Sequence, residues 1–168
     1  MEFKKIQLNG FKSFAEKADF LIEDGLTGIV GPNGCGKSNI VESLRWAMGE
    51  TSAKSMRGSG MEDVIFSGTS NKASKNIAEV TIEVENRDKE GPIQYREHDQ
   101  IQIKRKIEKD KGSKFYINGK EVRARDAQMF FADLSTGAHS PSMISQGRIG
   151  ALVTAKPTDR RAILEEAA

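Results

Sequence analysis

The segment Val30-Gly31-Pro32-Asn33-Gly34-Cys35-Gly36-Lys37-Ser38-Asn39 decides which fold this chain is expected to adopt. Within it, Gly31 to Ser38 match the pattern G-x-x-x-x-G-K-[ST] of loops that bind the phosphates of nucleotides. The glycines allow backbone N–H groups to turn toward an anion, and a helix that starts near Lys37 adds its positive end. We therefore predict that Lys37 contacts the β- and γ-phosphates of a nucleoside triphosphate and that the Ser38 hydroxyl binds the Mg²⁺ ion that accompanies it.

The segments on either side of this loop predict a strand before it and a helix after it. Leu26 to Val30 form an apolar run that indicates a buried strand, with a hairpin leading into it. After the loop, apolar residues recur at helical spacing and the pattern ends at Gly49, a suitable C-terminal cap; they are Ile40, Val41, Leu44, Ala47 and Met48. The alternative interpretation is a glycine-rich turn that binds no ligand.

The remaining residues predict an antiparallel meander and two further helices. Alternating apolar and polar residues indicate strands over residues 3–8, 78–84, 101–107 and 115–117, and a short apolar strand is expected at 64–66. Asn118-Gly119 is a strong hairpin signal. A helix is expected over Asp126 to Leu134, and another opens at Pro157 and is still on pattern at Ala168, which indicates a longer protein. The expected fold class is α/β.

Composition is that of a soluble globular domain. The 168 residues suffice for one domain, and 37% are hydrophobic and 30% charged. No run approaches the ~18–20 apolar residues of a membrane-spanning helix, and the first residues do not form a signal peptide, so we expect a cytosolic protein. Cys35 is the single cysteine, which excludes an internal disulfide; we interpret it as a small residue tolerated in the loop, the alternative being a reactive thiolate.

Positive charge is concentrated in the middle of the chain. Arg96 to Arg125 contain ten Lys or Arg against five Asp or Glu, although the whole chain carries a net charge of only +2. One interpretation is a solvated hairpin with scattered lysines, and the other is a surface that faces phosphates. The second makes the region near Lys104, Arg105, Lys106 and Lys114 a candidate DNA-facing surface.

Motifs beyond the loop resemble one family of ATPases. They are Gly10-Phe11-Lys12-Ser13-Phe14, Arg45-Trp46-Ala47-Met48-Gly49-Glu50, Ala53-Lys54-Ser55-Met56-Arg57-Gly58, Met61-Glu62-Asp63-Val64-Ile65-Phe66, Tyr116-Ile117-Asn118-Gly119, Gln146-Gly147-Arg148-Ile149 and Arg160 to Ala168. Together they resemble the N-terminal head segment of the SMC (structural maintenance of chromosomes) ATPases, most closely the bacterial, condensin-type branch. The resemblance implies a P-loop NTPase fold, with the N-terminal lobe of an ABC-type ATPase head over residues 1–155 and the start of a coiled-coil helix over 156–168.

The resemblance also implies roles for the loop and for one later residue. Gly31 to Asn39 would be the Walker A loop. Gln146 would be the Q-loop glutamine, which in this family contacts Mg²⁺ and helps to sense the γ-phosphate, so Ser38 and Gln146 are the expected metal ligands. The residues just before Gln146, Ser140-Pro141-Ser142-Met143-Ile144-Ser145, depart from the usual glycine-rich wording of this loop, which leaves its details open.

Four further positions receive roles from the resemblance. Lys12 and Ser13 resemble residues that approach the nucleotide phosphates from the first hairpin. Asp63 opens a segment, continuing to Phe66, that resembles the one beside adenine and ribose. Arg57 resembles the R-loop arginine of the family, an arginine-finger-like or DNA-linked group, and a planar, permanently charged fork suits the phosphates of either ATP or DNA.

In the family, ATP is held between this lobe and the signature motif of a second head. The resemblance thus implies DNA, a second identical head, a C-terminal head lobe, and kleisin and winged-helix subunits as partners, in an ATPase that compacts and segregates chromosomes at the nucleoid. This chain contains no apolar strand ending in Asp-Glu and no Leu-Ser-Gly-Gly motif, so we expect it to bind nucleotide weakly by itself and hardly to hydrolyse it. The alternatives are a coiled-coil DNA-repair ATPase, a nucleotide-dependent docking module without catalysis and, least compatible, a transport ATPase.

Overall fold

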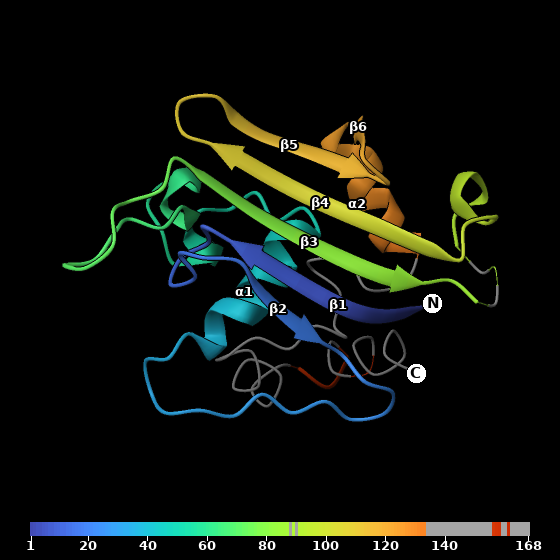
Figure 1. The fold of residues 1–168 in the computed structure, drawn as a ribbon. Coiled ribbons are helices and arrows are strands. Elements are labelled where there is room, and N and C mark those ends of the chain that lie inside the picture. Colours follow the sequence, from blue (N-terminus) through green and yellow to red (C-terminus); the bar gives the residue numbers. More distant parts are fainter. Residues whose placement is uncertain (88, 90, 134–155, 159–160, 162–168) are drawn as a thin grey trace.

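A computed structural model describes residues 1–87, 89, 91–133, 156–158 and 161 of the chain. In this part of the chain, six strands form one antiparallel sheet in the order β2-β1-β3-β4-β5-β6 (Figure 1). The strands are β1 (Glu2–Asn9), β2 (Ala18–Leu21), β3 (Ile77–Glu85), β4 (Gln100–Glu108), β5 (Gly112–Ile117) and β6 (Lys120–Val122). The α-helices are α1 (Lys37–Ala47) and α2 (Ala124–Asp133), and the 3-10 helices are η1 (Lys54–Met56), η2 (Met61–Val64) and η3 (Ile93–Tyr95). None of the described helices is long and apolar enough to span a membrane.

Strands β3 to β6 form the meander that the sequence predicts. In β3 and β4, alternate residues are buried, and the register pairs Ile82 with Ile103, so that the apolar residues of both strands lie on the same face. The last turn is formed by Asn118 and Gly119, at φ values of 49° and 79°. Positive φ at both central residues is the geometry that the tight hairpin turn requires, which explains why this pair of residues occurs there.

Both α-helices cover the same face of the sheet (Figure 1). Helix α1 packs on β3 and β4, and α2 packs on β5, and their side chains join the apolar residues of the sheet in one core. Trp46 of α1 is fully buried in this core, and its ring centroid lies 5.5 Å from that of Phe11. Helix α1 ends as predicted, because Gly49 follows its last turn at a φ of 107°, where glycine is favoured.

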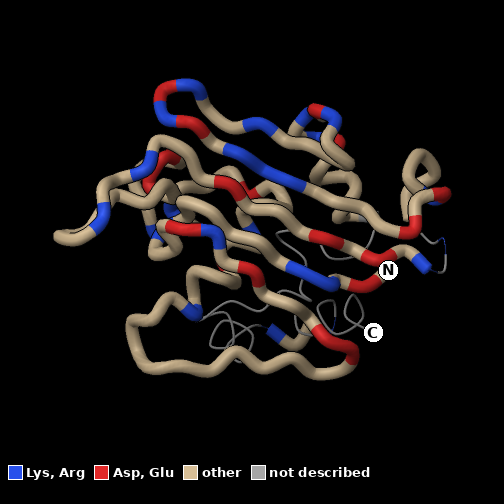
Figure 2. Tube along the Cα trace, in the orientation of Figure 1, with Lys and Arg blue, Asp and Glu red and all other residues tan. Residues whose placement is uncertain are grey.

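The opposite face of the sheet is polar. Figure 2 shows acidic residues along β3 beside basic residues along β4. The cross-strand pair of Lys106 and Glu79 has an Nζ to Oε1 distance of 3.8 Å, and Lys104 lies over the ring of Tyr116. No helix of the described residues packs against these side chains.

The expected strand over Leu26 to Val30 is wrong for this structure. These residues adopt neither helix nor strand, and Leu26 and Val30 are exposed to 101% and 93%. An apolar strand buried on both faces needs neighbouring strands on both edges and a layer on each side. Among the described residues, no strand pairs with this segment. The loop therefore leads into α1 without the strand that the pattern requires before it.

Two smaller expectations also differ. Residues 64–66 do not form a separate strand, since Val64 closes η2 and Ile65 makes only an isolated bridge with Phe11. The helix expected from Asp126 begins two residues earlier, at Ala124, and its expected end near Leu134 lies outside the described residues. Of the last expected helix, Pro157, Thr158 and Arg161 are helical, and the boundary at residue 155 lies outside the described part.

Arg105 is buried and cannot belong to a DNA-facing surface, which corrects one of the four positions suggested from charge. Its side chain points into the core, where its Nη1 donates to the carbonyl oxygens of Trp46, at 2.6 Å, and Glu50, at 2.7 Å. Because strands alternate their side chains between faces, Lys104 and Lys106 lie on the opposite, polar face. The burial lowers the pKa of the Arg105 guanidinium to about 10, with Glu50 opposing the shift.

Candidate nucleotide-binding site

The glycine-rich loop ends in a left-handed residue that starts helix α1. Gly36 is the N-cap of α1, with φ of 97° and ψ of 8°. A Cβ atom at this position would also lie 2.6 Å from Ser13 Oγ, so a side chain here would strain the backbone and displace the Ser13 hydroxyl. The first turn of α1 contains no acidic residue. The N-terminal N–H groups of the helix and its dipole are thus left without a negative partner from that turn, as an anion site requires.

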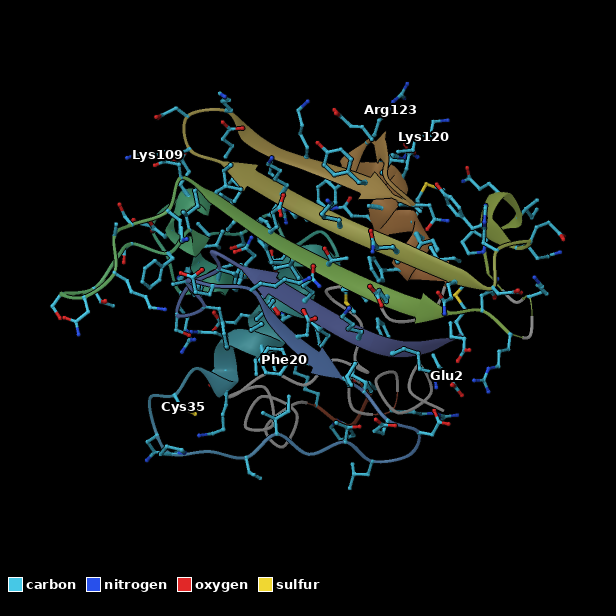
Figure 3. All side chains as sticks on the ribbon, viewed as in Figure 1. Glu2, Phe20, Cys35, Lys109, Lys120 and Arg123 are labelled. Atoms are coloured by element: carbon cyan, nitrogen blue, oxygen red, sulfur yellow. The ribbon has the colours of Figure 1, made fainter. Side chains whose placement is uncertain are left out.

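The Lys37 side chain folds back across the loop. Its ammonium donates to the carbonyl oxygens of Gly31, at 2.5 Å, and Pro32, at 2.6 Å, and lies 3.8 Å from Cys35 Sγ. These acceptors are uncharged, so a phosphate oxygen placed beside the ammonium would be the stronger partner. Cys35 is exposed. Figure 3 shows it beyond the β2 edge of the sheet, whereas Lys120 and Arg123 lie near the opposite edge, at β6.

A hydrogen-bonded chain joins several of the predicted site residues. Asn39, in the first turn of α1, donates from Nδ2 to Ser13 Oγ at 2.9 Å, and its Oδ1 accepts from Arg57 Nη2 at 2.8 Å. Arg57 Nε in turn pairs with the carboxylate of Glu42. The other oxygen of Glu42 pairs with Lys12 Nζ. The structure therefore brings together Lys12, Ser13, Asn39 and Arg57, which come from three separate segments of the chain.

Glu42, the residue that links the two cations, was missed by the sequence analysis. It is 8% exposed and belongs to the buried side of α1, whereas Val41, which was assigned to the apolar stripe, is 38% exposed. The sequence spacing could have indicated that Glu42 faces the core. Glu42 precedes Trp46 by four residues and follows Asn39 by three, and residues at these spacings share one face of a helix. A carboxylate on a core-facing stripe is rare without a charged partner.

Lys12 and Arg57 both hold left-handed backbone conformations. Their φ values are 47° and 55°, which non-glycine residues seldom adopt. Lys12 also donates from its backbone N–H to the Val64 carbonyl, at 2.7 Å, and from Nζ to the Met56 carbonyl. Backbone strain of this kind persists where the surroundings hold it in place and is concentrated at functional sites.

Asp63 lies beside this network, but its carboxylate accepts hydrogen bonds from residues of its own loop. Oδ2 accepts from the N–H and hydroxyl of Ser59, at 2.6 and 2.9 Å, and from the N–H of Gly60, at 3.0 Å. These bonds lower the pKa of Asp63, with the Gly60 N–H first among the causes and the charge of Lys12 a smaller one. Asp63 therefore shapes the start of η2, and its neighbour Val64 contacts Lys12 through the backbone.

The structure describes one of the two expected metal ligands. Ser38 is the second residue of α1 and is exposed. Gln146 lies outside the described residues, so its position relative to Ser38 stays a prediction. Among the described residues, no cluster of three or more His, Cys, Asp or Glu side chains could hold a metal ion. The donor set at Ser38 suits a Mg²⁺ ion that arrives with a triphosphate, since this ion keeps waters and takes few protein ligands.

Comparison with known proteins identifies the family. The model of the RecF/RecN/SMC N-terminal domain matches residues 2–148. The chain belongs to this family. A chromosome partition protein Smc of Rhodopseudomonas palustris is 54% identical over 168 residues, which are all of this chain and 15% of that protein. The chain thus spans about a seventh of the length of this relative.

Solved structures of SMC heads share the fold. A structure from work on the ATP-driven dimerization and DNA-stimulated activation of SMC ATPases has a TM-score of 0.87 and 31% identity, and the match covers 100% of both chains. An Smc head domain of Pyrococcus furiosus, solved with an extended coiled coil and bound to the C-terminal domain of ScpA, has a TM-score of 0.88 and 31% identity; the match covers 98% of this chain and 41% of that one. The expected fold class, the N-terminal lobe of a P-loop ATPase head, is confirmed.

Proposed function

We propose that this SMC-family chain binds Mg²⁺-ATP through residues 31–39 and forms the nucleotide-holding N-terminal lobe of an ATPase head. The observation that carries the proposal is the junction of loop and helix. Gly36 begins α1 in a conformation suited to glycine, no acid occupies the first turn, and Lys37 lies across the loop against uncharged acceptors. Together they provide N–H donors, a helix dipole and a cation for a polyphosphate.

The residues of the loop and several of their neighbours have proposed roles. Lys37 exchanges the carbonyls of Gly31 and Pro32 for the β- and γ-phosphate oxygens, and the backbone of Pro32 to Gly36 surrounds the phosphates. The Ser38 hydroxyl and Gln146 bind the Mg²⁺ ion, which neutralises phosphate charge when it is bound. Asn39 and Ser13 hold the first turn of α1 against the first hairpin through their 2.9 Å hydrogen bond. Asp63 and the residues after it border the base and ribose.

Hydrolysis requires parts beyond these residues. Phosphoryl transfer to water needs a group that orients the water, and a missing catalytic base costs roughly 10²–10⁴-fold. We propose that these groups come from a C-terminal lobe and from the signature motif of a second, identical head, so that ATP binding joins two heads and hydrolysis separates them. The related structure from work on ATP-driven dimerization supports this proposal. The chain alone would then turn ATP over very slowly.

The relatives also suggest partners and a biological role. The Pyrococcus furiosus head binds a ScpA domain, and the related curated proteins are named chromosome partition proteins. We propose kleisin and winged-helix subunits and DNA as partners of this protein, and chromosome compaction and segregation in the cytoplasm, at the nucleoid, as its role. On the chain itself, the polar sheet face with Lys104, Lys106 and Lys114 is the proposed DNA-facing surface, now without Arg105.

Calorimetric titration with Mg²⁺-ATP tests the nucleotide proposal. The full-length protein should bind, and Lys37→Ala should abolish binding or weaken it by about two orders of magnitude, because the variant no longer has the ammonium that pairs with the phosphates. Lys109→Ala, which removes an exposed lysine far from Cys35 in Figure 3, is the matched control and should bind as the wild type does. Equal binding by wild type and Lys37→Ala would contradict the proposal.

A further inference from the structure

We infer that Glu42 is a positioning residue of the nucleotide site, whose buried carboxylate holds Arg57 and Lys12 in place beside the first turn of α1. The inference rests on the proposed function, because the positions of Arg57 and Lys12 matter to turnover only if a nucleotide binds beside the first turn of α1. Oε1 of Glu42 pairs with Arg57 Nε, and Oε2 pairs with Lys12 Nζ. One carboxylate thus uses one oxygen for each of two cations that come from different loops.

The burial of Glu42 indicates that its position is set by the fold. Its side chain is 11% exposed and that of Lys12 is 13% exposed, whereas that of Arg57 is 56% exposed. A carboxylate removed from water to this degree is costly unless it is paired, and two cationic partners supply the compensation. Glu42 and Lys12 therefore form an internal anchor, and Arg57 is the partner that still reaches solvent.

The position of the Arg57 side chain depends on its bonds to α1. Arg57 caps η1 in a left-handed conformation, and its side chain is held by two residues of α1, Asn39 and Glu42, which are three positions apart on one helical face. A planar guanidinium bound at both Nε and Nη2 has a fixed direction as well as a fixed position. Among the described residues, loss of Glu42 leaves the Arg57 guanidinium with its bond to Asn39 and with less restraint on its direction.

Lys12 extends the same anchor to the neighbouring loops. Its ammonium joins Glu42 to the Met56 carbonyl, one residue before Arg57, and its backbone N–H binds the Val64 carbonyl after Asp63. The loop of residues 10–14, the loop of residues 56–58 and η2 are thereby tied to α1 at one point. A movement of α1 at its N-terminus, where the phosphates are proposed to bind, is passed directly to Arg57.

The test is a double-mutant cycle on ATP turnover by the full-length protein, with and without DNA. Glu42→Gln keeps the size of the side chain and removes its charge. It should lower the DNA-stimulated rate about tenfold, because displacement of a group that acts near the reaction is commonly this costly. Most of this loss should disappear when the same substitution is made in Arg57→Ala, and Glu42→Asp, which retains the carboxylate, should recover most of the rate.

Glu50→Gln is the matched control for a lost buried carboxylate. Glu50 is 1% exposed, pairs with Arg45 at 2.9 Å and lies just beyond the other end of α1. Both Gln variants should unfold at a lower temperature than the wild type, but only Glu42→Gln should lose stimulated turnover. A purely structural role for Glu42 predicts the same kinetic result for both variants.

Three results would overturn the inference: unchanged turnover in Glu42→Gln, a loss that adds in full to that of Arg57→Ala, or an Arg57→Ala variant as active as the wild type. Failure of the proposed function would look different. In that case the wild-type protein would not bind Mg²⁺-ATP, or Lys37→Ala would bind it equally well. Normal ATP binding that requires Lys37, together with a silent Glu42→Gln, would contradict the role of Glu42 alone.

Discussion

The guanidinium of Arg105 lies over the indole ring of Trp46, 4.5 Å from the ring centroid, and donates a hydrogen bond to the backbone carbonyl of the same residue. The guanidinium also lies over the ring of Phe115, whose centroid is 4.7 Å away. Its Nη1 donates to the Glu50 carbonyl as well, and its Nε donates to Ser113 Oγ at 2.8 Å. One side chain of β4 thus caps the C-terminal end of α1, the helix whose N-terminal end follows the glycine-rich loop.

Arg105→Met should destabilise the fold by about 2–4 kcal/mol, because buried carbonyls lose charged donors and a stacked side chain is replaced. The shift in the urea midpoint measures this cost. Arg105→Lys should rescue little of it, since an ammonium cannot reproduce the planar stack or the directions of the three bonds. Full stability in either variant would show that the stacked guanidinium contributes little.

Gly36→Ala should be more damaging than Gly34→Ala. Both residues have positive φ, 97° and 82°, but a Cβ on Gly36 meets Ser13 Oγ at 2.6 Å, whereas a Cβ on Gly34 has nothing within 4 Å. Backbone strain alone costs about 1–3 kcal/mol. Gly36→Ala should add to this strain the displacement of the Ser13 hydroxyl, so its affinity for Mg²⁺-ATP in calorimetry should fall well below that of Gly34→Ala. Equal affinities would show that contact with Ser13 is unimportant.

Asp63→Asn should change how the stability of the fold depends on pH. The folded-state pKa of Asp63 lies below its ordinary value of 3.8, mainly because the Gly60 N–H donates to it. A depressed pKa stabilises the fold above pH 3.8, and this stabilisation is lost as the pH falls through the lower, folded-state value. The variant should therefore be less stable than the wild type at about pH 6, and the difference should shrink at about pH 2. Chemical denaturation at the two pH values measures it, and a constant difference would contradict the assignment.

Charge reversal on the polar sheet face tests the DNA-facing surface. Lys104→Glu together with Lys106→Glu should weaken DNA binding by the full-length protein. The slope of log affinity against log salt should fall by about one for each phosphate that the protein no longer neutralises. Lys5→Glu, on β1 of the same sheet, reverses a lysine that already lies between Asp19 and Glu83 and should have a smaller effect. An unchanged salt slope in the double variant would remove this surface from the proposal.

Strands, turns and helices that are specified by residues close together in the sequence could be predicted from it. The alternation in β3 and β4 and the turn at Asn118-Gly119 depend on neighbouring residues, and the structure confirms them. The helix after the loop was predicted for the same reason, and its cap at Gly49 is confirmed. The family resemblance was carried by motifs and is confirmed by the match over residues 2–148.

Features that depend on distant partners were not predictable. Apolar composition at Leu26 to Val30 indicates burial, but a strand also needs a neighbour, and pattern cannot say whether one is present. Arg105 counts as surface charge in a sum over the sequence, although two of its acceptors, the carbonyls of Trp46 and Glu50, lie on α1 and just after it. Glu42 is similar, because its two cations come from loops that only the tertiary fold brings to the helix.

The pairing of β1 with β3 joins residues that are far apart in the sequence. Strands β3 to β6 join in chain order, each to the next, whereas Asn9 of β1 pairs with Glu79 of β3 across a long intervening segment that includes the glycine-rich loop and α1. Contacts between residues distant in sequence cost more loop-closure entropy and form late. We therefore expect the β3–β6 meander to form before β1 and β2 join the sheet, so that the loop would acquire its shape only after the meander is in place.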